Sequence, residues 1–467
     1  MFKVALINPT QFTKYPQPPM GLALIAAVLE REGYQVTVLE ANALKLKPEG
    51  VASLVSADVV GLTAMTPTIN TAIAIAHHLK KAYPDLPIIL GGAHATLLPE
   101  ETLVTAPEID ILVRGEGEET IIELLQALEH KQPLSKILGI SYRKDGEVVS
   151  NAARSKNIDL DSLPFVAYHL LPWRRYKPHP PHGRALPFAA IITSRGCPYR
   201  CSYCSKPIFG NKFRGQSPER VVEEVAYYKE RFGIKEIAFY DDVFTLDKRR
   251  AYAIADEIIK RGLKIHWTCE TRVNLVEKEL LRHIKQAGCY SIAYGIESAS
   301  PEILNTLEKD ITLEQVEEAV GIAQEVGLQT IGYFMLGSPG ETPETIDKTI
   351  QFAKKLKLDF AQFAITTPFP GTKLYDLYLK DKGGDISWEN FSYGGTGSKI
   401  APVFETNGLS RTDLQYWRGR AYKDFYLCPS YIWQRIRQVT SIRDLKVDIK
   451  GLAMLLGNVR ATPRHRE

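Results

Sequence analysis

The chain has 467 residues, of which 45% are hydrophobic and 24% charged, and its formal net charge is +4. This length exceeds one ordinary hydrophobic core, so roughly two or three domains are expected. The small net charge does not indicate nucleic acid, no apolar run approaches the roughly 18 residues of a membrane span, and the N-terminus resembles a first strand rather than a signal sequence. We therefore expect a globular protein of the cytoplasm.

Residues 1–130 alternate between strand-like and helix-like segments. Apolar runs typical of strands lie at 2–7, 35–39, 58–62, 87–90 and 110–113. Helical periodicity appears between them, for example at 22–31 and 69–82. This alternation predicts a doubly wound, Rossmann-like α/β domain, which binds ligands at the carboxyl ends of its strands.

Residues 131–184 break the pattern. A hairpin is predicted over 139–149, with Asp145 and Gly146 at its turn, and the stretch that follows is rich in Pro, His and Arg. Proline and glycine at this density support neither a helix nor a central strand. We interpret 131–184 as a linker.

Strand–helix alternation resumes over residues 185–390. The strand candidates lie at 187–193, 236–240, 264–268, 291–295, 330–335 and 360–365. The helical stretches lie at 218–231, 248–261, 277–287, 313–326 and 343–356. Repeats of this kind predict a partial, TIM-like (β/α)6 barrel, whose chemistry takes place on the loops after the strands.

The remaining residues, 391–467, are predicted to be mostly helical. They begin with a Gly/Ser-rich patch at 393–398 and carry an excess of Lys and Arg from Tyr431 onward. A solvated helical face explains such a charge run, and contact with an anionic surface or closure of the barrel mouth are the alternatives.

Three of the six cysteines, Cys197, Cys201 and Cys204, lie together in the loop after the first barrel strand. Clustered thiols in a long chain indicate a metal rather than a disulfide framework. Thiolates are the natural ligands of iron–sulfur clusters, and a loop that offers three leaves one iron open to another ligand. A structural zinc site is the alternative, although no second ligand pair of suitable spacing follows Cys204.

This loop resembles the CxxxCxxC signature of radical S-adenosylmethionine (SAM) enzymes, in which three cysteines bind a four-iron–four-sulfur cluster. There the open iron chelates SAM, and electron transfer yields a 5′-deoxyadenosyl radical. The resemblance covers residues 185–390 and implies SAM contacts near the cysteines and at the ends of the barrel strands. The positions that it indicates are Tyr203, Tyr240, Asp241, Asp242, Glu270, Arg272, Glu297, Leu336 and Gly337.

The chemistry of these side chains suits the parts of SAM. Carboxylates at 241 and 242 suit its ammonium group, Arg272 suits its carboxylate, and Glu270 suits a ribose hydroxyl. For Asp242, a structural role as a helix cap is equally open.

The first domain resembles the cobalamin-binding domain of cobalamin-dependent radical SAM enzymes. It lacks the cysteines of the methylthiotransferases, and residues 8–11 are unlike a dinucleotide-binding glycine turn. Small residues would let a corrin approach closely, and threonines could bind its amides or phosphate. The resemblance implies cobalamin contacts from Pro19, Met20, Gly21, Thr63, Met65, Thr66, Thr68, Gly91, Gly92, Ala93, His94, Gly115, Glu116 and Gly117.

Classical cobalamin domains coordinate cobalt through a histidine in the loop after the first strand. Residues 8–12 contain no histidine. We therefore expect cobalamin to bind without a protein histidine ligand in that loop, with its nucleotide tail tucked into the sheet. His94 is the alternative ligand, although it could equally hydrogen-bond the tail or fill a loop.

Together these resemblances imply a C-methyltransferase. A 5′-deoxyadenosyl radical would abstract hydrogen from an unactivated carbon, which would then take a methyl group from methylcobalamin. The alternatives are a cyclase, oxidase or rearrangement enzyme with the same cofactors, and a corrinoid- or zinc-binding regulatory protein without catalysis. The family chemistry also implies a low-potential electron donor such as flavodoxin or ferredoxin, and a cluster that oxygen destroys. The substrate is open among a lipid, a tetrapyrrole, a peptide side chain and a natural-product intermediate.

Overall fold

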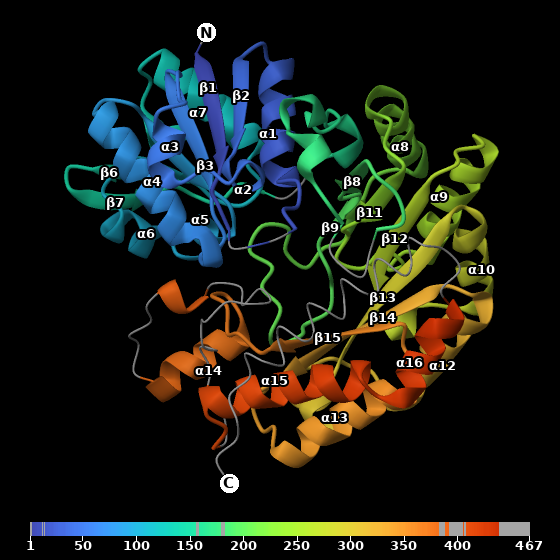
Figure 1. The fold of residues 1–467 in the computed structure, drawn as a ribbon. Helices are drawn as coiled ribbons and strands as arrows, with labels where there is room; N and C mark the ends of the chain where they lie inside the picture. The colour runs from blue at the N-terminus through green and yellow to red at the C-terminus, as the bar shows by residue number, and fades with distance from the viewer. Residues whose placement is uncertain are drawn as a thin grey trace.

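The computed structural model describes residues 2–11, 13, 15–155, 158–178, 183–382, 388–391, 405 and 408–438. Within these residues the chain forms an N-terminal α/β domain and a barrel that lie beside each other, with the C-terminal helices along the lower edge of the barrel in Figure 1. The Gly/Ser-rich patch at 393–398 and the basic stretch from 439 onward lie outside the described residues.

The N-terminal domain is a doubly wound sheet, as predicted. Its parallel strands are β1 (Lys3–Asn8), β2 (Gln35–Glu40), β3 (Val59–Thr63), β4 (Ile88–Gly91) and β5 (Ile111–Val113), in the order β2-β1-β3-β4-β5. Its helices are α1 (Met20–Arg31), α2 (Ala41–Leu44), α3 (Pro48–Ala52), α4 (Ile69–Ala82), α5 (Ala93–Leu97), α6 (Pro99–Thr105) and α7 (Glu118–Glu129). Successive strand residues face opposite sides, so Leu6 packs in the core beneath α1 and α7, and Ile7 packs beneath α3 and α4.

The predicted hairpin belongs to this domain rather than to a linker. It consists of β6 (Ile140–Lys144) and β7 (Glu147–Ser150), and β6 pairs antiparallel with β5. Ile140 and Tyr142 are buried in the core beneath α1 and α7, which holds the hairpin against the sheet. The boundary expected at residue 130 was therefore too early, and the connecting segment begins after residue 150.

The connecting segment packs against both units. Tyr168 and Tyr176 are buried in the main core of the barrel, and the Tyr168 hydroxyl donates a hydrogen bond of 2.9 Å to the Phe188 carbonyl oxygen. Leu160 and Leu163 pack instead on Val28 of α1. The segment thus joins the two units by burial as well as by covalent connection.

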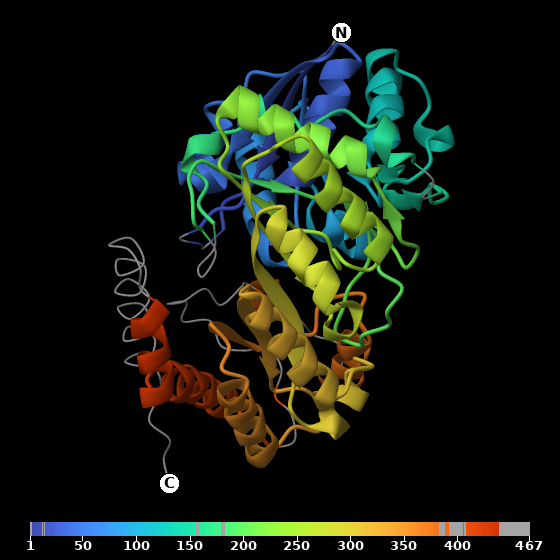
Figure 2. The same ribbon diagram turned by 90° about the vertical axis from the view of Figure 1, so that its right-hand side faces the viewer.

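The second unit is the predicted partial barrel. Its parallel strands, in spatial and chain order, are β8 (Phe188–Ile191), β11 (Glu236–Phe239), β12 (His266–Thr271), β13 (Cys289–Glu297), β14 (Gln329–Leu336) and β15 (Phe360–Ile365). Its helices are α8 (Pro218–Phe232), α9 (Lys248–Lys260), α10 (Lys278–Gln286), α11 (Pro301–Thr306), α12 (Leu313–Val326) and α13 (Pro343–Lys355). Figure 2 shows these helices, coloured green to orange, in a row along the outer side of the strands. A short ribbon of β9 (Ser194–Arg195) and β10 (Arg214–Gly215) flanks the cysteine loop.

Helices complete the chain that is described beyond the barrel: α14 (Lys373–Lys382), α15 (Arg411–Tyr426) and α16 (Pro429–Gln438). Helix α15 covers the open edge of β15, where the Tyr426 hydroxyl donates to the Ala361 carbonyl oxygen at 2.8 Å and accepts from the Ala361 amide at 3.0 Å. These bonds satisfy backbone groups that an exposed edge strand would leave open. None of the described helices has the length and apolar composition needed to cross a membrane.

Candidate functional site

A cavity of about 1200 Å³ opens at the carboxyl ends of the N-terminal strands, on the side that faces the barrel. Its wall contains most of the residues predicted to contact cobalamin: Pro19, Met20, Gly21, Thr63, Met65, Thr68, Gly91, Gly92, Gly115, Glu116 and Gly117. A cavity of this size suits a large ligand, and the glycines at and just after the ends of β4 and β5 allow it to approach the backbone closely.

Gly92 shows why glycine is needed in this wall. Its φ angle is +100°, and a β-carbon at this position would lie only 2.6 Å from the Ala64 carbonyl oxygen. A larger residue would therefore strain the backbone and push apart the turns after β3 and β4.

His94, Thr66 and Ala93 are not part of the described wall, although the sequence grouped them with it. The His94 ring is buried, lies 3.3 Å from the Thr66 hydroxyl and meets the Trp388 ring edge-on at 4.9 Å. Burial lowers the pKa of His94 to about 4, so the ring is neutral at physiological pH. His94 therefore packs one wall turn against another, and the described wall of the cavity contains no histidine.

Part of the cavity wall comes from segments that the sequence did not indicate. The connecting segment contributes Leu160, Leu163, Pro164 and Val166, and the barrel contributes Ile191, Ile192, Arg195, Ile208 and Phe209. These residues were missed because the sequence gives no sign that a presumed linker folds over the sheet. The cavity is thus shared between the N-terminal domain and the barrel.

The cysteine loop is anchored by Asp241. Its carboxylate accepts hydrogen bonds from the amide and hydroxyl of Thr193, both at 2.7 Å, and from the amide and hydroxyl of Ser194, at 2.5 and 2.8 Å. Asp241 is buried, and these bonds use both of its oxygens. In this structure Asp241 holds the strand that leads into the cysteines.

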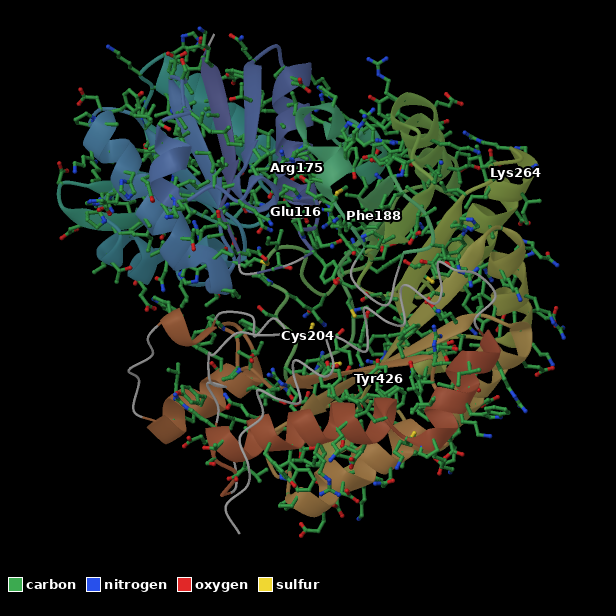
Figure 3. All side chains as sticks on the ribbon, in the orientation of Figure 1. Glu116, Arg175, Phe188, Cys204, Lys264 and Tyr426 are labelled. Carbon is green, nitrogen blue, oxygen red and sulfur yellow. The ribbon has the colours of Figure 1, made fainter. Side chains whose placement is uncertain are left out.

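The three cysteines follow at the centre of the molecule, where Figure 3 labels Cys204. Burial raises the pKa of Cys197 and of Cys204, the latter to about 11, and the charge of Cys201 adds to both shifts. Lys206 closes the loop by donating from Nζ to the Cys197 carbonyl oxygen at 2.9 Å. In the part of the chain that the structure describes, no three His, Cys, Asp or Glu side chains are already arranged around one metal position. Cluster assembly would therefore require the loop to adjust and its thiols to release protons.

Arg272 lies beside this loop. Its Nη1 is 3.5 Å from Cys201 Sγ, and its guanidinium carbon lies 3.7 Å from the centre of the Tyr199 ring. The buried guanidinium of Arg272 thus places a positive charge next to the cysteine loop. The donor set, three thiols of one loop with a neighbouring guanidinium, fits an iron–sulfur cluster with one open iron.

A second cavity, of about 330 Å³, lies at the mouth of the barrel. Two residues predicted to contact SAM, Glu270 and Glu297, line it together with Tyr333, Phe334, Met335, Gln362 and Ala364. The Tyr333 hydroxyl donates to Glu270 Oε1 at 3.0 Å, and burial raises the pKa of Glu270.

Glu297 belongs to a network that reaches the cysteine loop. The Lys309 ammonium donates to Glu297 Oε1 at 2.8 Å and to the Tyr203 hydroxyl at 3.0 Å, and the Tyr203 hydroxyl donates to Glu297 Oε1 at 2.9 Å. Glu297 has a φ of +69°, which points to a tightly constrained strand end. Lys309 was missed because it lies after α11, where no strand ends.

The other positions predicted to contact SAM lie outside the described wall of this second cavity. The Tyr240 hydroxyl donates to Gln17 Oε1 of the N-terminal domain at 2.8 Å. Burial and the charge of Asp241 raise the pKa of Asp242. Leu336 is buried, and Gly337, at a φ of +84°, packs against Leu414 of α15.

Gln362 of β15 is among the lining residues of both cavities. The amide of this residue offers one acceptor and two donors. A substrate placed there would face the N-terminal domain on one side and the barrel mouth on the other.

Comparison with known proteins agrees with this division of the chain. The B12 binding domain model matches residues 13–125, and the Radical SAM superfamily model matches residues 191–353. The first segment lies within the N-terminal domain, and the second lies within the barrel.

Relatives match both parts together. The chain is 38% identical to an uncharacterized methyltransferase of Pyrococcus horikoshii, over 89% of each chain. It is 29% identical to the anaerobic magnesium-protoporphyrin IX monomethyl ester cyclase of Rubrivivax gelatinosus, over 89% of this chain and 75% of the relative. The fold resembles the radical SAM methyltransferase TsrM from Kitasatospora setae, solved with cobalamin and a [4Fe-4S] cluster, with a TM-score of 0.69 and 21% identity over 86% of this chain and 79% of that one.

Proposed function

This chain belongs to the cobalamin-dependent radical SAM enzymes, and we propose from that premise that it transfers a methyl group to an unactivated carbon of its substrate. One observation carries the proposal: Gln362 borders both the large cavity and the barrel mouth. A substrate bound beside it would be within reach of ligands in both cavities.

The residues of the two cavities suit the cofactors of this family. Cys197, Cys201 and Cys204 would hold a [4Fe-4S] cluster, and Glu270 with Tyr333 would contact SAM through their polar groups. The large cavity would hold cobalamin, with Thr63 and Thr68 able to bind its amides or phosphate. When bound, these groups supply a 5′-deoxyadenosyl radical and a transferable methyl group.

The chain's own residues would prepare this reaction by position and by exclusion of water. Asp241 fixes the strand before the cysteines, and the connecting segment closes the apolar side of the large cavity. A dry site protects a carbon radical from side reactions. Electrons would come from a low-potential donor such as flavodoxin or ferredoxin.

A second candidate function keeps the cofactors and changes the outcome to cyclisation, oxidation or rearrangement. The 29% identity to the anaerobic cyclase of Rubrivivax gelatinosus favours this candidate. The higher identity, 38%, to a protein described as a methyltransferase supports methyl transfer as the first candidate.

The two candidates differ in products that can be measured without knowing the substrate. The anaerobically reconstituted protein is mixed with SAM, a reductant and, in half of the samples, hydroxocobalamin. We expect 5′-deoxyadenosine in all samples and S-adenosylhomocysteine only in those with the corrinoid. Deoxyadenosine without S-adenosylhomocysteine would favour the second candidate, and the absence of both would contradict each.

Cysteine variants give this assay a matched control. Cys201→Ala removes a predicted cluster ligand and should abolish deoxyadenosine. Cys428→Ala removes a thiol that contacts the Phe425 carbonyl oxygen near the end of α15, and should leave both products. Equal deoxyadenosine formation by the two variants would contradict the assignment of the cluster to this loop.

A further inference from the structure

Three buried charged side chains and one partly buried one join the N-terminal domain to the cysteine loop. Glu116 lies in the turn before α7 and Glu118 is the first residue of α7, whereas Arg195 lies on β9 and the partly buried Arg214 on β10. Arg195 donates from Nη1 to Glu116 Oε2 at 2.7 Å and from Nη2 to Glu118 Oε1 at 2.5 Å. Arg214 also donates to Glu116, from Nη1 at 3.2 Å. The side chains of Arg195, Glu116 and Glu118 are each at most 8% exposed, so water screens these charges little.

Arg195 is rigidly tied to the first cysteine. Only Gly196 separates it from Cys197, and Gly196, at a φ of +83°, is packed so closely that a β-carbon would collide with the Lys212 carbonyl oxygen. On its other side, Ser194 is held by Asp241. A displacement of the Arg195 guanidinium would therefore change the position of Cys197.

Glu118 has an unused hydrogen-bonding atom. Its Oε2 is buried and finds no partner among the described residues, while Glu116, Glu118 and Arg195 all line the large cavity. An acceptor left without a donor in this way is costly. A corrin ring carries primary amide side chains on its edge, and their N–H groups are donors of the kind that Oε2 lacks.

We propose that Glu118 accepts a hydrogen bond from an amide of the corrin. Arg195 acts as a positioning residue: because it donates to Glu118 and lies two residues before Cys197, it couples this hydrogen bond to the geometry of the cysteine loop. The inference rests on the proposed function, because it requires cobalamin and the cluster to bind the same chain. This coupling has a thermodynamic consequence. A cluster in the loop raises the affinity for the corrinoid, and the corrinoid raises the affinity for the cluster by the same factor.

The test measures the affinity of hydroxocobalamin for the full chain, with and without the reconstituted cluster, by anaerobic absorbance titration. We expect wild-type protein to bind it about fivefold or more tightly when the cluster is present. We call the affinity for hydroxocobalamin with the cluster, divided by the affinity without it, the coupling ratio. In the double variant Arg195→Gln/Glu118→Gln this ratio should fall to about one. The double variant removes one positive and one negative charge and leaves Glu116 paired with Arg214, so no buried charge loses its partner.

A matched control uses a second ion pair of the same helix. Arg154 pairs with Glu119 at 3.2 Å, and Glu119 is 55% exposed. The double variant Arg154→Gln/Glu119→Gln makes the same chemical change away from the cavity and should keep the wild-type ratio. Should Arg195→Gln/Glu118→Gln not fold, Glu118→Gln alone keeps the side-chain volume and should lower the ratio toward one.

The outcomes separate this inference from the proposed function. A wild-type ratio of one, or an unchanged ratio in Arg195→Gln/Glu118→Gln or in Glu118→Gln, would overturn the coupling and leave the function standing. A lowered ratio in the Arg154→Gln/Glu119→Gln control would also overturn it, because the effect would not be specific to the cavity wall. Failure of the cluster-loaded wild type to bind hydroxocobalamin would overturn both.

Discussion

At the scale of single residues, the cysteine loop depends on side chains that are not ligands. Asp241 binds both residues before Arg195, and Lys206 binds the carbonyl oxygen of Cys197. These contacts explain how a loop that belongs to no helix can hold one geometry. Asp241 therefore contributes to the site by supporting the ligands, in addition to any contact with SAM.

Asp241→Asn tests this support. An amide places N–H groups where the carboxylate accepts hydrogen bonds from Thr193 and Ser194, and lost hydrogen bonds to a charged group cost about 1.5–3 kcal/mol. We expect a lower melting temperature and a lower iron content after reconstitution, both measured on the purified protein. Asp256→Asn, which changes an exposed carboxylate paired with His283, is the control. Equal iron contents in the two variants would contradict the supporting role of Asp241.

Only some of the site residues could be predicted at this scale. The cysteines are close in sequence, so their spacing alone was enough to propose them as cluster ligands. Arg195 and Glu118 are 77 residues apart, and Tyr203 and Glu297 are 94 apart, so neither pair has a local signature. A single sequence carries no signal for such pairs, because they form only when segments far apart in the chain fold together.

At the scale of elements, the turns after the strands shape the cavities. Gly92 lets the turn after β4 pass close to the turn after β3, as described above. The same turn then begins α5, which places His94 away from the cavity. The sequence located these turns correctly but not the direction of each side chain.

Gly92→Ala should damage the cavity. A non-glycine residue at a positive φ costs about 1–3 kcal/mol, and the contact with the Ala64 carbonyl oxygen adds to it. We expect a lower midpoint in urea denaturation and weaker binding of hydroxocobalamin. Gly50→Ala in α3, where a β-carbon meets open space, should be neutral or slightly stabilising. A Gly92→Ala protein as stable as Gly50→Ala would contradict the close packing of these turns.

The turn between β14 and α13 is expected to make the stability of the protein depend on pH. Glu341 accepts hydrogen bonds from the amides of Gly337 and Ser338, and burial raises its pKa from 4.5 to about 7. The folded protein therefore retains a proton that the unfolded chain releases, and stability falls as the pH rises from 4.5 to 7. At 1.36 kcal/mol for each pKa unit, this amounts to about 3 kcal/mol.

Glu341→Gln should remove this dependence, because the amide cannot ionise. The variant should gain stability relative to wild type between pH 5 and pH 8, which thermal denaturation across this range measures. Glu344→Gln changes an exposed carboxylate in the first turn of α13 and should show no such gain. A wild-type curve parallel to that of Glu341→Gln would contradict the assignment.

At the scale of the whole molecule, the sequence predicted the two α/β units better than the boundary between the first unit and the segment that follows it. Strand–helix alternation gave both α/β units, because buried parallel strands and amphipathic helices have strong periodic patterns. The hairpin β6–β7 was detected but assigned to a linker, since its pairing with β5 is a tertiary event. For the same reason the shared wall of the large cavity, with Leu160 and Leu163, became visible only in the fold.

From this arrangement we expect a single chain to hold two metal cofactors that face one substrate position beside Gln362. Anomalous diffraction from one crystal of reconstituted protein with hydroxocobalamin tests it most directly, with data at the iron and cobalt absorption edges. The account predicts an iron peak at Cys197, Cys201 and Cys204 and a cobalt peak in the large cavity of the same chain. A cobalt peak elsewhere on the protein, or iron bound away from these cysteines, would contradict it.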